Sequence, residues 1–335
     1  MDILTPFLLA FVDSTSAAFA LAAIGLGVHF GYAGLLNFGQ AGFMAIGAYG
    51  FAIWTTMAAP TTNWGWPPAA SFISAVIVGP VAASIYAFVL GIPTLRLRGD
   101  YLAIVTIAAA EIVRYTVRTT ELTPITGGSQ GLTGAAIKTD IQAINPLPPG
   151  QYGFWIFNAG AYDTWIRILA WALVAIALVV VWMLFRSPWG RVVKGIREDE
   201  DAVRSLGKNV FNYKMQVLIL GGVLGALGGI MYVMPRALQP DFFAAPTTFY
   251  LWTALLLGGA ATVFGPVIGA ILFWATLNGV RAVIRLLHDV GVFGDITATQ
   301  AAQLAFVFVG FALILLVVFR PQGIFGNKKE LSFNV

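Results

Sequence analysis

The chain has 335 residues, of which 59% are hydrophobic and 10% are charged, and its mean hydropathy is +0.83. A soluble protein of this length would need far more polar surface to cover its core, so the composition indicates a membrane protein. The net charge of +4 does not indicate nucleic acid binding, because the basic residues fall mostly in short loops between apolar runs. The sequence has no cysteine, and its two histidines, His29 and His288, lie far apart, so neither a disulfide nor a metal centre is expected.

Apolar segments recur along the chain at the length of about 20 residues that a membrane-spanning helix needs. We expect such helices at roughly 15–36, 39–58, 70–92, 101–118, 165–185, 214–234, 248–264, 266–284 and 301–319. A shorter apolar stretch at 3–12 is expected to form an interfacial or re-entrant piece. Together they predict a single all-α polytopic membrane domain over 1–335 with about nine to ten transmembrane helices.

The basic residues predict the orientation of these helices. With the N-terminus outside, the segments 93–100, 186–213 and 320–335, together with Lys214, lie inside and carry twelve Lys and Arg, against six on the outside. The positive-inside rule favours this arrangement, which places the C-terminus in the cytoplasm. Glycines at four-residue spacing, such as Gly221, Gly225 and Gly229, indicate helices that pack closely.

A glycine-rich break between the first two predicted spans carries two amide side chains, Asn37 and Gln40. Backbone freed within the membrane needs protein or water partners, so such a break suits a segment that lines a cavity on the substrate pathway. A tight turn at the inner side is the other interpretation, and it is the favoured one.

Two ionisable residues, Glu111 and Arg114, lie three apart on one face of the predicted span 101–118. Charged groups within a membrane helix are costly, so they should face the bundle interior, a partner or the outer interface. They either contact a zwitterionic solute on its pathway or form a structural ion pair that braces two helices. The second interpretation is at least as well supported as the first.

The outer segment 119–164 is too polar to span the membrane and too long for a turn, so we expect an ordered loop with a short helix. The stretch 278–290 places Arg281, Arg285 and Asp289 at four-residue spacing. It predicts an amphipathic extension at the outer surface that meets either a protein partner or lipid headgroups.

The inner segment 186–213 is the longest polar stretch on its side and has a helical pattern of its own. Asp199, Glu200 or Asp201 can cap a short helix, and Gly207 with Asn209 supplies its C-terminal stop. Such a helix, lying parallel to the membrane, would give a partner a rigid lever, whereas a solvated connector is the plainer interpretation. The residues alone leave both open.

The stretch 191–209 resembles the cytoplasmic coupling loop of ABC importer permeases, in which a Glu-Ala-Ala segment precedes a Gly. This chain reads Glu200-Asp201-Ala202 before Gly207, so Asp replaces the first Ala, as in the branched-chain amino-acid permeases. Four further segments resemble that family in order along the chain: 34–49, 95–106, 126–132 and 319–326.

The resemblance implies an importer in the bacterial plasma (inner) membrane. Its partners would be a second permease subunit, identical or homologous, two cytoplasmic ABC ATPases, an extracellular or periplasmic solute-binding protein, and membrane lipid. No Gly-x-x-x-x-Gly-Lys-[Ser/Thr] loop occurs, so this chain is expected to be a non-enzymatic subunit without a cofactor, with ATP and Mg on the ATPases. The residues expected to couple to the ATPases are Arg197, Glu198, Glu200, Asp201, Ala202 and Gly207. Those expected to dock the binding protein are Thr126, Gly127, Gly128, Ser129 and Gln130.

The implied solutes are branched-chain amino acids, with urea or short amides as the alternative. A secondary transporter or channel is the nearest competitor from another class, but it usually needs several buried carboxylates. Glu111 is the only carboxylate well inside a predicted span. An intramembrane enzyme has little support, because the sequence offers no metal-binding His pair, thiol or acidic dyad.

Overall fold

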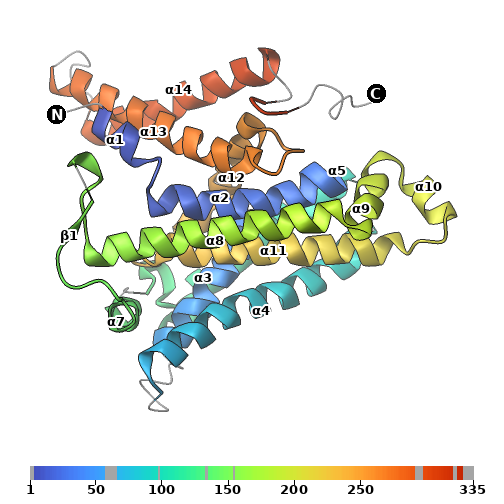
Figure 1. Ribbon diagram of the computed structural model, residues 1–335, viewed down its shortest axis with the longest axis horizontal. Coiled ribbons are helices and arrows are strands. Elements are labelled where there is room, and N and C mark those ends of the chain that lie inside the picture. Colours follow the sequence, from blue (N-terminus) through green and yellow to red (C-terminus); the bar gives the residue numbers. More distant parts are fainter. Residues whose placement is uncertain are drawn as a thin grey trace.

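The computed structural model describes residues 4–56, 66–96, 99–132, 135–153, 155–290, 297–319 and 323–326, and nearly all of its regular structure is helical (Figure 1). Every predicted span coincides with a helix. These helices are α2 (Ser14–Gly27, continued by a π-helical turn, Val28–Tyr32), α3 (Gln40–Thr56), α4 (Pro68–Thr94), α5 (Gly99–Arg118), α8 (Ala161–Arg186), α11 (Val210–Val233), α12 (Ala245–Gly258), α13 (Gly265–Asp289) and α14 (Ala298–Phe319). The short stretch at the N-terminus forms α1 (Leu4–Leu9).

Five helical stretches within the described residues are long and apolar enough to cross a membrane. They are Ser14–Tyr32, Pro68–Thr94, Ala161–Arg186, Val210–Val233 and Gly265–Asp289. The helices α3 and α12 have only 17 and 14 residues, fewer than the roughly 20 that cross the hydrocarbon unaided. The structure therefore supports an all-α membrane protein, while the number of nine to ten spans stays a prediction.

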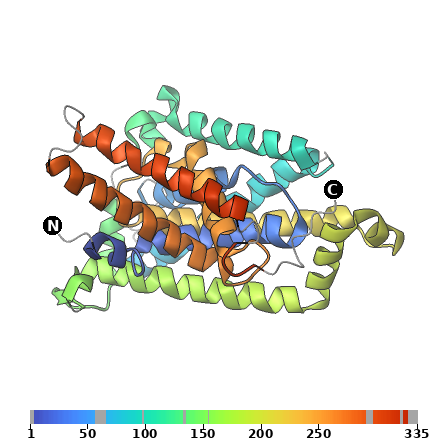
Figure 2. The same ribbon diagram turned by 90° about the horizontal axis from the view of Figure 1, so that it is seen from above.

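The helix α2 forms the centre of the bundle, and all of its residues are buried. It packs against α11, α13, α8 and α12, and its Ala- and Gly-rich sequence lets these neighbours approach closely. Figure 2 places α5 and α8 on opposite sides of the bundle. The outer faces of α4 and α8 expose Ile, Val, Phe and Met side chains, as expected of surfaces that meet lipid or another membrane protein.

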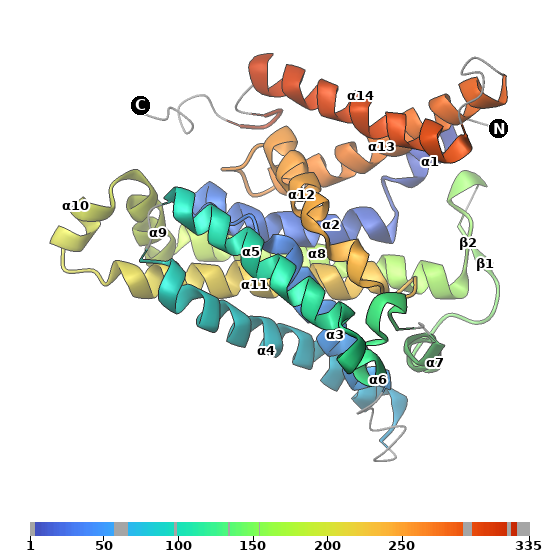
Figure 3. The same ribbon diagram turned by 180° about the vertical axis from the view of Figure 1, so that it is seen from behind.

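The bundle has two polar ends, which we name after the short helices found there (Figures 1 and 3). The α10 end carries α9 (Pro188–Glu198) and α10 (Glu200–Ser205). The α7 end carries α6 (Thr123–Thr126), α7 (Ala135–Ala143), and the antiparallel strands β1 (Gln151–Tyr152) and β2 (Ala159–Gly160), in which Gln151 pairs with Gly160. It also carries single 3-10 turns, among them η4 (Gly128–Gln130) and η6 (Pro240–Phe243). Between residues 119 and 160 the described residues thus form short helices, 3-10 turns and a two-stranded sheet, while the expected docking role of this segment stays a prediction.

Two of the predictions concern residues at these ends of the bundle. The stretch 278–290 continues α13, which runs without a break from Gly265 to Asp289, so the expected helical extension is present. The basic residues Arg98, Arg320, Lys328 and Lys329, which entered the orientation count, lie outside the described residues. The orientation itself stays a prediction.

The glycines at four-residue spacing lie where helix backbones touch. A Cβ added at Gly229 of α11 would lie 2.0 Å from the carbonyl oxygen of Met44, and one added at Gly47 of α3 would lie 2.4 Å from that of Ala226. The backbones of α3 and α11 are therefore in contact at two levels. The predicted role of Gly229 in close packing is confirmed.

This contact predicts the effect of one methyl group. Gly229→Ala should lower the free energy of unfolding by about 1–3 kcal/mol, since the neighbouring backbone must move to admit the side chain. Gly310→Ala in α14 is the matched control, because a Cβ there meets nothing within 4 Å and alanine favours the helix by about 1 kcal/mol. Thermal unfolding of the detergent-purified protein measures both, and equal melting temperatures for the two variants would contradict the packing assignment.

Candidate functional site

The polar segment between α8 and α11 folds into two short helices joined at a single residue. Ser187 caps α9 by accepting a hydrogen bond from the Gly190 amide, and Pro188 occupies the first helical position. Asp199 adopts an extended conformation between the helices, and its carboxylate accepts a 2.9 Å hydrogen bond from the Ala202 amide. Of the three predicted caps, Asp199 is therefore the one that caps α10. We call 187–209 the elbow.

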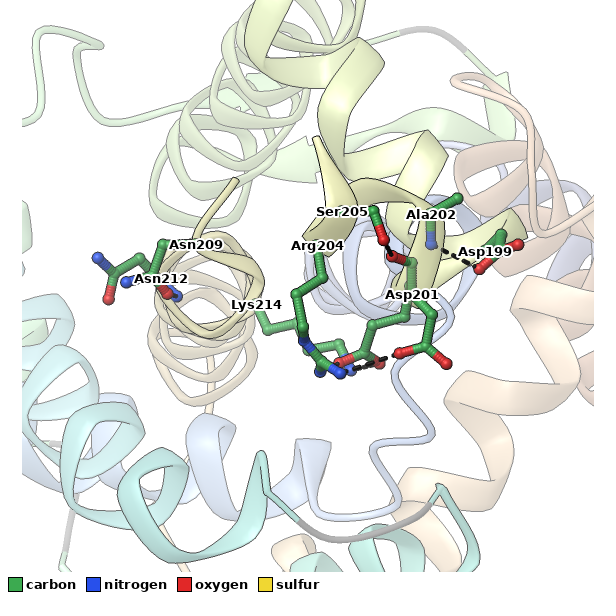
Figure 4. Close-up of polar contacts among 9 residues, drawn as sticks. Asp199, Asp201, Ala202, Arg204, Ser205, Asn209, Asn212 and Lys214 are labelled. Carbon is green, nitrogen blue, oxygen red and sulfur yellow. Dashed lines mark hydrogen bonds and ion pairs between the residues drawn. The ribbon is translucent and has the colours of Figure 1, made fainter. Parts of the chain in front are cut away.

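The end of α10 was predicted only in part. Gly207 follows the helix with a φ of +73°, the left-handed conformation that glycine adopts without strain. Asn209 does not belong to this stop: its side chain accepts a 3.1 Å hydrogen bond from the Asn212 amide and so caps α11 instead (Figure 4).

Ion pairs connect α10 to the first turns of α11. The Glu200 carboxylate accepts a 2.9 Å hydrogen bond from Arg204 and pairs with Lys214 of α11. Asp201 pairs only with Arg204 among the described residues, also at 2.9 Å, and its side chain is 88% exposed (Figure 4). Beneath them Val203 packs on Val210. Glu200 therefore faces the bundle, whereas Asp201 faces outward.

The helix α9 reaches the end of α2. The Arg197 guanidinium donates to the carbonyl of Gly31 in the π-helical turn, and the Arg197 side chain covers Gly34. Lys194 lies 5.7 Å from the ring of Tyr32, which stacks on Phe185 of α8. The elbow thus contacts both α2 and α11, two helices that lie far apart in the sequence.

The outward surface of α10 is mixed polar and apolar. Leu206, the residue before Gly207, is 78% exposed. Beside the elbow lies an open cavity of about 1050 Å³. Charged side chains that line it include Arg96, Arg197, Glu200, Arg204, Lys208 and Lys214. From the sequence, Leu206 is predicted only as part of the short helix. Its place directly before the helix-ending Gly207 could have indicated an exposed apolar side chain.

The coupling residues expected from the sequence therefore lie in different settings. Arg197 and Glu200 point toward the bundle, Gly207 ends α10, and Glu198, Asp201 and Ala202 are exposed.

The break after α2, residues 34–39, has no regular secondary structure, and it begins at Gly34 with a φ of +69°. Its backbone amides find partners on other helices, as when Phe38 donates to the Thr106 hydroxyl of α5 at 3.0 Å. Gly34 and Leu35 line the 1050 Å³ cavity. Asn37 does not, because it is 1% exposed.

Asn37 and Gln40 belong to a buried hydrogen-bond network. The Asn37 amide group donates to the Gln40 side-chain oxygen and to His29 Nδ1, each at 3.0 Å. With Nδ1 as acceptor, His29 Nε2 carries the proton and donates to the Leu218 carbonyl of α11 at 3.1 Å. The Asn37 carbonyl in turn accepts from the Trp252 indole of α12 at 3.1 Å.

Gln40 completes this network between α2, α3 and α11. Its amide donates to the carbonyls of Ala22 and Gly221, at 3.2 and 3.1 Å. Gln40 and His29 are both fully buried. The geometry supports a bracing role for these amides, with their polar groups satisfied by protein.

Glu111 and Arg114 form an ion pair at 2.7 Å, and the structure extends it to a second element. Arg114 also pairs with Asp241 of η6 at 2.9 Å. The second Glu111 oxygen accepts a 3.0 Å hydrogen bond from the Ala245 amide in the first turn of α12, where a negative charge is favourable. Asp241, 127 residues from Arg114, was missed because sequence reasoning offered no signal for the pairing.

The loop expected to dock a binding protein is pinned by its own backbone. Gly127 and Gly128 have φ values of +76° and +57°, and the Thr126 hydroxyl donates to the Val117 carbonyl at 2.7 Å. Thr126 and Gly128 are buried, whereas Ser129 and Gln130 are exposed. Two hydrogen bonds between Leu132 and Leu238 then fix the loop to the segment after α11. Only Ser129 and Gln130 therefore offer side chains to a partner.

The described residues contain no cluster of three or more His, Asp or Glu side chains placed to hold a metal ion. None of the groups above is arranged as a nucleophile with a base. The polar contacts of the elbow hold it against α2 and α11.

Comparison with known proteins identifies the family of the chain. The sequence model of a family described as "Branched-chain amino acid transport system / permease component" matches residues 8–318. The chain is 29% identical to the high-affinity branched-chain amino acid transport system permease protein LivM of Escherichia coli K12, over 93% of this chain and 69% of LivM. It is 23% identical to LivH, another permease protein of the high-affinity system in that organism, over 93% and 92% of the two chains. A probable LivM of Methanocaldococcus jannaschii is 24% identical over 78% and 71%. The chain therefore belongs to the permease-component family of branched-chain amino acid transport systems.

Proposed function

We propose that this permease subunit passes branched-chain amino acids into the bacterial cytoplasm as part of an ATP-driven importer. The observation that carries the proposal is the elbow, a capped two-helix element tied by Arg197 to α2 and by Glu200 to α11. A partner that displaces α10 moves both helices. The family supports the same role.

The proposed importer assigns separate tasks to its partners. Two cytoplasmic ABC ATPases hold ATP and Mg and press on the elbow, and an external solute-binding protein delivers the amino acid at the α7 end. The likeness to both LivM and LivH supports a core of two homologous permease chains. The α10 end, which carries Arg96, Arg197 and Lys208, then faces the cytoplasm, in keeping with the positive-inside rule.

In the same proposal, four residues act on the substrate pathway by fixing the helices around it. They are Asn37, Gln40, Glu111 and Arg114. The amides fix α3 between α2 and α11, and Glu111 with Arg114 fixes the start of α12. Solute passage then requires these contacts to be kept or exchanged as the helices move. Urea and short amides are the alternative solutes.

The proposal predicts the solute that drives the complete system. Reconstituted in liposomes with its second permease, the ATPases and the binding protein, the importer should hydrolyse ATP faster with leucine, isoleucine or valine, because the loaded binding protein signals across the bundle. Initial rates of phosphate release and of radiolabelled uptake measure this. Stimulation by urea or acetamide but not by leucine would assign the alternative, and leucine uptake without ATPases would refute the importer.

Leu206 is predicted to anchor the ATPase. Leu206→Ser should weaken copurification of the ATPase subunits, since an exposed apolar side chain that becomes buried at an interface contributes about 2 kcal/mol or more. The permease fold should be unaffected because this side chain is 78% exposed. Leu206→Met keeps the apolar surface and serves as control; equal subunit ratios in both variants would exclude the anchor.

Gly207 is predicted to matter through its backbone conformation alone. A Cβ there meets no atom within 4 Å, so only the φ of +73° opposes a side chain. Gly207→Val should cost about 1–2 kcal/mol at the end of α10 and separate ATP hydrolysis from uptake. Gly207→Asn, whose side chain tolerates this conformation, should keep the ratio of solute transported to ATP hydrolysed. A normal ratio in the Val variant would argue against a lever.

A further inference from the structure

A second cavity, of about 450 Å³, opens at the α7 end, apart from the elbow and the buried amides. It lies between the start of α2, the end of α11, the first turns of α12 and the outer half of α13. Its volume falls within the range of about 300–1,000 Å³ typical of small-molecule sites. The pocket combines two guanidinium groups, aromatic rings and carboxylates.

The two guanidinium groups come from different helices and are held by aromatic rings. Arg236 lies 4.2 Å from the ring centre of Tyr232 and donates to the Thr15 hydroxyl at 2.7 Å. Arg281 lies 4.8 Å from the ring centre of Phe306, and Tyr232 and Tyr250 line the same pocket as Arg281. Tyr232 therefore lies near both cations.

Neither cation has an ion pair with any carboxylate in the described part of the chain. By contrast, Arg114 and Arg118 both form ion pairs with Asp241. A guanidinium group has five N–H donors in a planar fork that matches a carboxylate. Arg236 and Arg281 thus keep donors that a solute carboxylate can use, in a half-buried setting where such bonds are stronger than in water.

The remaining wall fits the other parts of an amino acid. Phe242, Tyr250 and Trp274 supply an apolar surface for a hydrocarbon side chain. Asp13 and Asp241 lie at the pocket and can accept hydrogen bonds from an ammonium group. No single group in the pocket identifies the ligand as an amino acid. The combination of guanidinium groups, carboxylates and an apolar wall does.

We propose that this pocket binds a zwitterionic amino acid on the permease itself, with its carboxylate on Arg236 and Arg281. The inference rests on the proposed function for the direction of transport, and it adds a selectivity step beyond the binding protein. Uncharged solutes such as urea and short amides would lack the group that the two cations recognise.

The chain contains a matched control for Arg281. Arg285 lies one turn further along α13 and was grouped with it by sequence spacing, yet Arg285 is exposed and does not line the pocket. A variant at each position therefore separates charge on the outer surface from charge in the pocket.

The test compares L-leucine with leucinamide, which keeps the ammonium and the side chain but replaces the carboxylate with a neutral amide. Isothermal titration of the purified permease–ATPase complex, without binding protein, should give at least about tenfold tighter binding of L-leucine, since charge-assisted hydrogen bonds are lost in the amide. Arg236→Gln and Arg281→Gln should each weaken L-leucine about tenfold and leave leucinamide unchanged. Arg285→Gln should keep the wild-type preference.

Absence of a leucine preference in the wild type, its retention in both pocket variants, or its equal loss in Arg285→Gln would overturn the pocket. Arg281→Lys keeps the charge and should recover part of the preference, which guards against a general folding defect. The two proposals fail separately. Leucine-stimulated ATP hydrolysis with unaltered preference in the pocket variants refutes the pocket alone, whereas absence of stimulation in the complete wild-type system refutes the proposed function.

Discussion

The close approach of α2 and α11 is the contact on which the rest of the bundle depends. A Cβ at Gly25 would lie 2.4 Å from the Gly221 carbonyl oxygen, and one at Gly221 would lie 2.5 Å from that of Gly25. Lipid is as apolar as the helix surfaces, so no hydrophobic effect drives two membrane helices together. Packing and hydrogen bonds must therefore hold such pairs. The Gln40 amide donates to both helices at this level, and leaving a buried group of this kind unpaired costs about 1–3 kcal/mol. The amide thereby fixes the register of the pair.

Both attachments of the elbow end on this same pair of helices. Arg197 binds the carbonyl of Gly31 at the end of the α2 stretch, and Glu200 binds Lys214 near the start of α11. Because Gln40 joins the pair, a displacement of the elbow is expected to move α2 and α11 together rather than apart. At the α7 end, Asp241 attaches the connection between α11 and α12 to α5. In the proposed importer, movement of the pair would be passed to neighbouring helices through a few polar contacts.

Features that depend on residues close in the chain, such as helices and their caps, could be predicted from the sequence. Features that depend on tertiary packing could not. The apolar runs located the helices, the Gly207 stop was predicted, and Asp199 was one of three candidate caps, all within ten positions of Gly207. The pairing of Arg114 with Asp241 and the different exposure of Arg281 and Arg285 depend on how distant helices meet, which spacing along one helix does not encode. Asn209 was misassigned because it lies between the end of α10 and the start of α11, where an asparagine can serve as a C-terminal stop or as an N-cap.

The strength of the elbow follows from which of its contacts are buried. Its ion pairs are largely exposed, with the Arg204 side chain 62% accessible, and such pairs typically contribute only about 0.2–1 kcal/mol each. The buried contact beneath α10 is small: Ile196 and Val203 pack with Val210 of α11, below the pair of Glu200 and Lys214. Alone, α10 is thus held weakly against a bundle that is held tightly by backbone contact. A partner that buries Leu206 adds apolar contact to the exposed face of α10, so the elbow should stiffen on binding and transmit force only while it is bound.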